Sequence, residues 1–498
     1  MSFSGSSTDI KESVYIVDEE NGLASSRVST IIGKNSELSD EEKEHLRQYY
    51  RKCDLRITLF FCVGYMLDFM VRTSISGAKI VGMIDALKLK PSDFNVALSL
   101  FFIGHMLFQI PSNIILKSTR PTLWIMTLLF AMGVCCMSTA AVKGEISLYA
   151  CRIVLGIVEA GYPAGSLYFL YSWFPRVEVG KRIGYFYSFA AVSNVIEGPL
   201  NAGLSKIVDS KIAPWQWVFL ILGALPCLWA IVGLFIVSDY PQEAGFLTLE
   251  EKRAISKVFK QQGNKSDKKE FNWKQARLAF CDWRIWICCV IGLAAHMVFH
   301  AGALFGPVLL KSLGFSSEMS DGLNAIPNVF GFIALASSGF VVNRIGSTGL
   351  TQAIYEAVAT IGFIVAVVAP HKGSQIAGLF IFIIATAPGM ALAAAWVSSN
   401  QAGTTKPVIA SGLISAGASF GGFITSFIYR DQDAPRYILG HSVCIGLCVL
   451  VVILSLLLTW LLSRENRHRD ETFFDLSKLS EQEVADLCDR HPSFRYRI

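Results

Sequence analysis

Charged residues are scarce in this chain. Asp, Glu, Lys and Arg together make up 17% of its 498 residues, whereas soluble globular domains carry about 25%. Hydrophobic residues account for 52% of the sequence, and the mean hydropathy is +0.46. This balance excludes an ordinary soluble protein and predicts a chain that places much of its surface in lipid.

The motifs of several enzyme classes are missing as well. The sequence holds no GxxxxGK[ST] phosphate loop and no HExxH zinc motif, so ATP-driven pumping and zinc-dependent hydrolysis have no candidate site. Its twelve cysteines include no CxxC pair that would hold zinc. We therefore expect neither an enzyme nor a bound cofactor or metal.

Long apolar runs are what the sequence does have. A helix needs about 20 mostly apolar residues to cross the hydrocarbon core, and the hydropathy pattern predicts about twelve such helices. The predicted spans are residues 55–77, 92–116, 121–142, 147–170, 183–206, 214–238, 283–306, 320–342, 349–370, 374–397, 405–428 and 437–463.

The polar segments divide these spans into two groups of six. Residues 239–282 are rich in lysine and glutamate and predict a cytoplasmic linker between halves at 55–238 and 283–463. Polar tails are expected at 1–54 and 464–498. In the first tail, SDEEKEHLRQYYRK begins with a capping box from Ser39 to Glu42 and predicts a short surface helix. No cleavable signal peptide is expected.

Lysine and arginine predict the orientation. With both termini in the cytoplasm, the cytoplasmic segments carry clearly more basic residues than the opposite side, as the positive-inside rule requires. The net charge of +5 follows from this bias. No basic cluster interleaved with aromatics indicates a nucleic-acid partner.

Ionisable residues inside the predicted spans are few, and each costs about 2.5 to 3.5 kcal/mol at a helix centre, so each should face the bundle interior or a cavity. The candidates among them are Asp68, Arg72, His105, Arg152, Glu159, Glu197, His296, His300 and Glu356.

Two pairs among them share a helix face. Asp68 and Arg72 are one turn apart and can form an ion pair. Arg152 and Glu159 are two turns apart, about 10 Å along the axis, so they lie on one stripe without necessarily touching. The alternative to a functional role for the second pair is that it clamps helices together by hydrogen bonds.

Many stretches match one known family in order and spacing. They include RKCDLRITLF, RTSISGAKIVGM, QIPSNIILK, RIVLGIVEAGYPAGSLYFLYSWFPRVEVGKR, FNWKQARLAFCDWRIW and WVSSNQAGTTK, within residues 50–470. In these stretches the chain resembles the major facilitator superfamily, and within it the fungal allantoate permease-like family of anion:cation symporters, which are related to sialin-type organic anion transporters.

The chain departs from this family at two places. The glycine–aspartate–arginine loop after the second span is absent from IPSNIILKSTRP, although Asn343 and Arg344 keep a partial copy after the eighth span. The family also has adjacent Asp and Arg near the end of the first span, whereas here Val71 precedes Arg72. Asp68, one turn earlier, is the candidate replacement for the missing carboxylate.

The resemblance implies an all-α integral membrane protein of the major facilitator fold, with twelve transmembrane helices in two halves, working by alternating access. It implies that Arg72 and Arg152 bind an organic anion and that Glu159, with Asp68, couples transport to protons. In this hypothesis deprotonated Glu159 attracts Arg152, and protonation frees that arginine for substrate.

Other residues have a functional and a structural interpretation. His296 and His300 lie one turn apart and either line the cavity or simply hydrogen-bond within the bundle. Asn400 and Gln401 match a family signature that either binds substrate or caps a loop at the cytoplasmic gate. The stretch VIEGPLNAGL, which contains Glu197, faintly resembles a fifth-span motif of antiporters. Anion exchange therefore stays an alternative function.

The sequence therefore predicts proton-coupled import of a small organic anion, a carboxylate nutrient such as a vitamin, a ureide or an amino-acid-like acid. The alternatives are an anion exchanger, a passive uniporter that would not need Glu159, and a nutrient sensor signalling through its tails. We expect a monomer in the plasma membrane, or in an internal membrane such as that of the vacuole or endoplasmic reticulum. Its partners are the anion, protons and lipid.

Overall fold

The computed structural model describes residues 39–207, 211–261, 273–402, 406–471, 488–490 and 494–498. All regular secondary structure in these ranges is helical. The first 38 residues of the predicted N-terminal tail lie outside the described ranges. So do residues 472–487 of the predicted C-terminal tail.

The first half of the bundle contains six long helical segments. They are α3 (Leu59–Ile80), α5 (Pro91–Ser118), α6 (Pro121–Thr139), α7 (Glu145–Glu159) continued by α8 (Tyr162–Trp173), α9 (Arg176–Leu204) and α10 (Pro214–Ile236). A single turn, α4 (Met83–Ala86), follows α3. Proline at the start of α5, α6 and α10 suits the first turn, where its missing N–H costs no hydrogen bond.

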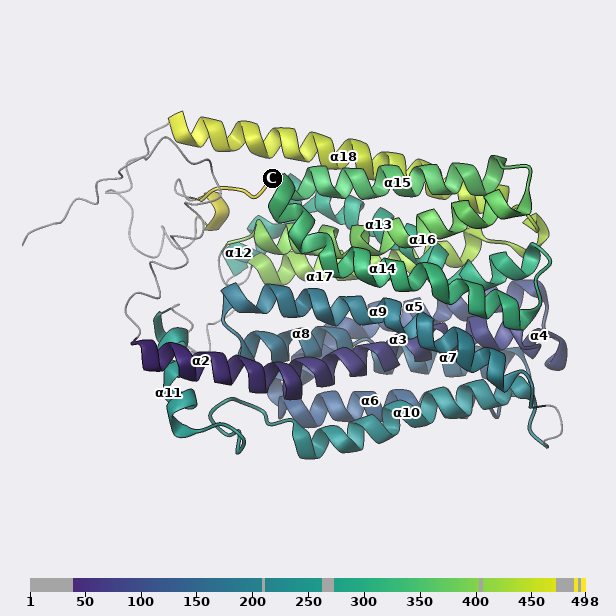
Figure 1. The fold of residues 1–498 in the computed structure, drawn as a ribbon, viewed down its shortest axis with the longest axis horizontal. Helices are drawn as coiled ribbons and strands as arrows, with labels where there is room; N and C mark the ends of the chain where they lie inside the picture. The colour runs from purple at the N-terminus through teal and green to yellow at the C-terminus, as the bar shows by residue number, and fades with distance from the viewer. Residues whose placement is uncertain (1–38, 208–210, 262–272, 403–405, 472–487, 491–493) are drawn as a thin grey trace, which may run out of the picture.

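The second half repeats this layout with six long helices. They are α13 (Trp283–Ser312), α14 (Ser317–Ile345), α15 (Thr348–Val368), α16 (Lys372–Ser399), α17 (Lys406–Ile428) and α18 (Ile438–Glu471). The twelve predicted spans therefore all correspond to helices. In Figure 1 the long helices run roughly side by side, with α2 and α18 ending near the same end of the bundle.

One predicted span differs in form. Residues 147–170 were expected to form a single helix, but α7 ends at Glu159 and α8 begins at Tyr162. Pro163 lies in the first turn of α8, where it cannot donate the backbone hydrogen bond that would continue α7. The break leaves Glu159 at the last helical position of α7.

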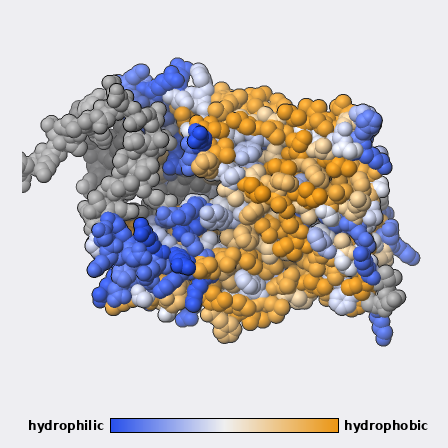
Figure 2. All heavy atoms as spheres, in the orientation of Figure 1, coloured by the Kyte–Doolittle hydropathy of each residue, from blue (hydrophilic) through white to orange (hydrophobic). Residues whose placement is uncertain are grey.

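The surface of the bundle fits a bilayer. Figure 2 shows hydrophobic side chains covering the middle of the molecule and hydrophilic ones gathered at its two ends. Within the described residues, nine helical stretches are long and apolar enough to span a membrane by length and composition. The long helices outside that group are α3, α5 and α9, and these bring polar side chains into the interior.

The polar linker is partly helical. It contains α11 (Leu249–Gln261) and α12 (Trp273–Phe280). The predicted surface helix is confirmed as α2 (Asp40–Cys53), with the capping box between Ser39 and Glu42. It joins α3 through a π-helical turn at Asp54–Thr58. Lys52 Nζ pairs with Glu251 Oε1 of α11 at 2.8 Å, which fastens the linker to the start of the first half.

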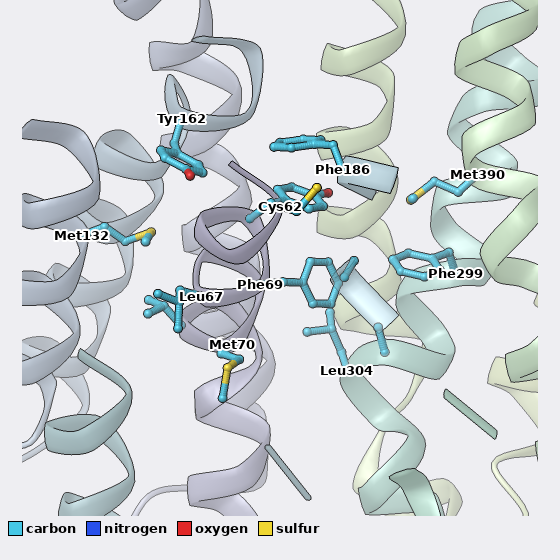
Figure 3. Packing of buried hydrophobic residues seen from close by; sticks show 14 of the residues in the cluster. Cys62, Leu67, Phe69, Met70, Met132, Tyr162, Phe186, Phe299, Leu304 and Met390 are labelled. Carbon is cyan, nitrogen blue, oxygen red and sulfur yellow. The ribbon is translucent and has the colours of Figure 1, made fainter. Parts of the chain in front are cut away.

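The two halves meet along three helix pairs, α9 with α14, α5 with α17 and α3 with α13. Aromatic rings fill part of this interface, and Figure 3 shows Phe69 of α3 facing Phe299 of α13, with ring centroids 5.9 Å apart. At the end of the bundle away from α2, Lys311 Nζ and Ser317 Oγ both donate to the Ile80 carbonyl oxygen, at 2.8 and 3.0 Å. These bonds hold the halves together at that end.

Candidate functional site

An ion-pair cluster lies inside the first half, between α3 and α7. Arg72 donates from Nε to Glu159 Oε1 at 2.7 Å and contacts the same oxygen through Nη2. Its Nη2 also reaches Asp68 Oδ2 at 3.5 Å. The spacing of Asp68 and Arg72 predicted that these two residues could pair, whereas the contact between Arg72 and Glu159 joins residues 87 positions apart.

The three residues of this cluster differ in how much of their side chains is exposed. Asp68 and Glu159 are fully buried, and 11% of the Arg72 side chain is exposed. Asp68 Oδ1 and Glu159 Oε2 have no hydrogen-bond partner within the described part of the chain. Arg72 is therefore the one member of the cluster with exposed surface, and each carboxylate keeps one oxygen available for a proton.

Glycines allow the helices around this cluster to approach closely. A side chain on Gly156 of α7 would collide with the Phe101 carbonyl of α5, and one on Gly104 would collide with the Ile153 carbonyl. The two backbones therefore pack directly against each other. This contact fixes the depth of Glu159 relative to α5.

Arg152 lies apart from this contact, and the expected attraction between Arg152 and Glu159 does not produce an ion pair. Its guanidinium lies 6.0 Å from the ring centroid of Phe219 on α10, and the residue is 1% exposed. The Nε and Nη2 atoms have no hydrogen-bond partner among the described residues. Two helical turns separate Arg152 from Glu159, so the nearer Arg72 takes the carboxylate.

Three histidines lie on α5 and α13, two helices that meet the other half of the bundle. His105 Nδ1 of α5 is 2.9 Å from Ser419 Oγ of α17, and His296 Nδ1 is 2.7 Å from the Gly292 carbonyl. His300 packs against Phe102 with ring centroids 5.1 Å apart, and its Nδ1 has no partner within the described chain. His105 Nε2 is likewise unpartnered there, so His105 and His300 each keep a ring nitrogen free for a ligand or a proton.

The serine bonded to His105 belongs to a Gly-x-Ser-x-Gly stretch, residues 417–421. Such a motif marks a hydrolase nucleophile only where a strand turns sharply into a helix. Ser419 instead lies inside α17 and donates to the Ser415 carbonyl at 3.2 Å. The structural context of a hydrolase is therefore missing here. In the described part of the chain, no group of three or more His, Cys, Asp or Glu side chains could hold a metal ion.

Asn400 binds the C-terminal segment of the chain. Its Nδ2 donates to the Arg497 carbonyl at 2.9 Å, and its Oδ1 accepts from the Arg497 N–H at 2.7 Å. Trp396 Nε1 donates to the same carbonyl at 2.9 Å. Gln401 lies next to Asn400 and is half-buried, with Oε1 unpartnered among the described residues. The structure thus places the family signature against the end of the chain, away from Arg72.

A buried charge cluster completes this contact. Lys406 Nζ donates to Asp282 Oδ2 at 2.6 Å and also contacts Asp489. Tyr496 donates to Asp489 Oδ2 at 2.9 Å. Burial, and then the neighbouring carboxylate, raise the pKa of the Tyr496 hydroxyl above its ordinary value, so it remains a donor. Through these contacts, the C-terminal segment that carries Asp489 and Tyr496 links the starts of α13 and α17 at one end of the second half.

We predict that Lys406→Ala lowers the free energy of unfolding by about 3–5 kcal/mol, because it leaves the buried Asp282 without its cation and Asp489 with only Arg284, at 3.6 Å. Thermal unfolding of the detergent-purified protein measures this change. Lys257→Ala is the matched control, since Lys257 pairs with Glu42 at 3.1 Å on the surface and exposed pairs contribute about 0–1 kcal/mol. Equal losses of stability in the two variants would contradict the prediction.

Sequence comparison identifies the family. Residues 61–426 match the family model of the Major Facilitator Superfamily. The chain belongs to this superfamily. Within it, the finer assignment to the allantoate permease-like family stays a prediction.

Several fungal relatives in the superfamily match the chain nearly end to end. The major facilitator-type transporter hxnP of Emericella nidulans is 25% identical, over 93% of this chain and 95% of its own length. The uncharacterized transporter C1683.12 of Schizosaccharomyces pombe is 27% identical, over 95% and 98%. The MFS transporter prlL of a fungal species is 27% identical, over 82% and 85%. The protein is therefore a membrane transporter rather than an enzyme.

Solved structures of other transporters share the fold. A D-xylose-proton symporter aligns with a TM-score of 0.62 at 15% identity, covering 81% of this chain and 97% of its own. A bacterial homologue of the lysosomal transporter Spinster, in an inward-facing and unoccupied conformation, aligns with a TM-score of 0.60 at 15% identity, covering 81% and 96%. This likeness supports the twelve-helix major facilitator fold.

Proposed function

We propose that this transporter imports a small organic anion together with a proton, and that Arg72 binds the anion. The observation that carries the proposal is the sharing of the partly exposed Arg72 guanidinium between two buried carboxylates, Glu159 and Asp68. A guanidinium stays charged and offers a planar fork of donors that matches a carboxylate. The anion has to compete with Glu159 for the same donors.

Protonation of Glu159 removes this competition. A neutral carboxylic acid binds a guanidinium more weakly than a carboxylate does, so the proton frees Arg72 for the substrate anion. One proton and one monovalent anion together add no net charge to a buried site, and this avoids the cost of an uncompensated charge. Glu159 is the proposed main proton site, with Asp68 as a second carboxylate on the same arginine.

The remaining predicted residues have lesser parts in this proposal. In this proposal His300 lines the route between the halves, and His296 supports α13 through its bond to Gly292. Arg152 contributes positive charge near Glu159 without touching it. Asn400 and Gln401 act through the docked C-terminal segment at one end of the second half. We further propose a monomer in the plasma membrane with both termini cytoplasmic.

Uptake assays in cells lacking their own carboxylate permeases test the proposal. We expect cells expressing the full chain to accumulate at least one labelled carboxylate from a panel of vitamins, ureides and amino-acid-like acids. A protonophore should abolish this accumulation. Uptake that is indifferent to the protonophore would favour a passive uniporter, and uptake driven only by preloaded anion would favour an exchanger.

A further inference from the structure

Two helices carry matching polar stripes that the proposed anion site does not use. On α9 the stripe is formed by polar residues at spacings of three and four, and on α14 the same spacings recur. These spacings place side chains on one face of a helix. The stripes are Asn194, Glu197 and Asn201 on α9, and Asp321, Asn324 and Asn328 on α14.

The two stripes face each other across the interface between the halves. Asn194 Nδ2 donates to Asn328 Oδ1 at 3.1 Å. Further along, Gly198 lies against the Asp321 backbone so closely that a side chain there would collide with the Asp321 carbonyl. Because α9 belongs to the first half and α14 to the second, any group bound between the stripes touches both halves.

A small polar cavity lies between the stripes. Its volume is about 20 Å³, which suits a single water-sized occupant. Residues from α3 and α13 close it. The lining consists of Thr73, Ser76, Gly77, Asn194, Glu197, Gly198, Asn201, Ala303, Pro307, Asp321 and Asn324. No lysine, arginine or histidine is among these described lining residues, and the nearby Lys311 donates to the Ile80 carbonyl instead.

Three oxygen atoms of this lining are buried without a partner in the described part of the chain. They are Asn201 Oδ1, Asp321 Oδ2 and Asn324 Oδ1, and each residue is at most 4% exposed. Leaving a buried acceptor unsatisfied costs about 1–3 kcal/mol. All three residues line the same small space, and an occupant that accepts electron pairs from each of them would satisfy these acceptors.

The charge of these ligands indicates a monovalent ion. Glu197 is already engaged, because its Oε2 accepts from Thr73 Oγ1 at 2.5 Å. The lining holds two carboxylates, Glu197 and Asp321, and no cationic side chain among its described residues, so one of the two keeps a proton. The remaining charge of −1 is balanced by one monovalent cation. Hard cations take oxygen ligands, whereas one proton would satisfy only one of the three acceptors.

We propose that this cavity binds Na⁺ between the two halves, through Asp321, Asn201 and Asn324. The site goes beyond the proposed anion transport and does not depend on which substrate is carried. Because its ligands come from α9 and α14, bound Na⁺ stabilises the arrangement of the halves in which the stripes meet. The ion thus biases the alternating-access equilibrium from a position separate from Arg72.

Thermal unfolding of the purified full-length protein tests the site without any substrate. NaCl is titrated at constant ionic strength against choline chloride, with KCl as a parallel series. We expect Na⁺ to raise the unfolding midpoint saturably, by about 1 °C for each 1 kcal/mol of binding linkage in a chain of this length. Neither K⁺ nor choline should do so. Equilibrium binding of radioactive Na⁺ to the same preparation should saturate near one ion per chain.

Variants separate this site from general salt effects. Asp321→Asn should abolish the Na⁺ response, and the milder Asn201→Ala should weaken it about tenfold in apparent affinity if Asp321→Asn does not fold. Glu356→Gln is the control, because Glu356 is equally buried on α15 and bonded to Gln352. Glu356→Gln should respond to Na⁺ as the unaltered protein does. Three results would each overturn the Na⁺ site. They are a shift of the unfolding midpoint that K⁺ or choline reproduces, a shift that persists in Asp321→Asn, and a midpoint that responds to pH but not to Na⁺.

Discussion

Glu159→Gln is expected to abolish concentrative uptake while leaving downhill movement of the anion in place. Glutamine cannot release a proton, so it resembles the protonated state in which Arg72 is free for substrate. A gradient of one pH unit is worth about 1.36 kcal/mol, which corresponds to about tenfold accumulation for one proton per anion. Proteoliposomes with an acidic exterior should therefore show about tenfold accumulation with the unaltered protein and equilibration with the variant.

The matched control for this experiment is Glu356→Gln. Glu356 is fully buried, as Glu159 is, and its Oε1 accepts from Gln352 Nε2 at 3.2 Å. The substitution therefore makes the same chemical change at a similar depth in the other half. The control should keep proton-driven accumulation. If Glu159→Gln still accumulates the anion against its gradient, Glu159 is not the coupling residue, and Asp68→Asn becomes the variant to measure.

Arg72→Lys is expected to raise the KM for the anion by at least about tenfold. Lysine keeps the positive charge but loses the fork of donors. A hydrogen bond to a charged group contributes about 1.5–3 kcal/mol, and 1.4 kcal/mol is tenfold in affinity. Initial rates of uptake at increasing substrate concentration, normalised to the amount of protein in the membrane, measure this change.

Two further variants define what the Arg72 result means. Arg430→Lys makes the same exchange in an exposed pair, where Arg430 Nε lies 3.0 Å from Asp433 Oδ2, and should leave KM unchanged. Arg152→Lys alters a guanidinium that touches neither carboxylate and should raise KM less than Arg72→Lys does. A larger rise in KM for Arg152→Lys than for Arg72→Lys would indicate that the anion binds nearer to α10 than to α3.

The sequence by itself determined the class of protein and its division into helices. Apolar runs of about 20 residues can satisfy their backbone hydrogen bonds in a bilayer only as helices, so the twelve spans followed from composition and length. The helix α2 followed from its capping box, because that signal is local. The family followed from stretches spread over most of the chain.

The helical content of the linker and the break after Glu159 were not predicted. Pro163 was a local signal for the break, but the apolar run continues across it. The spacing of three and four residues also predicts the polar stripes on α9 and α14, which include Asn194, Glu197 and Asn201. Only Glu197 among these residues stands out in the sequence, because asparagine carries no formal charge and Asp321 lies at the start of its span.

Only the tertiary structure decided which charges meet. Sequence spacing relates residues on one helix, so it linked Asp68 to Arg72 and placed Arg152 on the stripe of Glu159. The contact of Arg72 with Glu159 depends on how α7 packs against α5, which brings Glu159 within reach of the long Arg72 side chain of α3. The contact of Asn400 with Arg497 depends on where the C-terminal segment docks. Such contacts join positions far apart in the sequence, and packing of the whole bundle sets their distances.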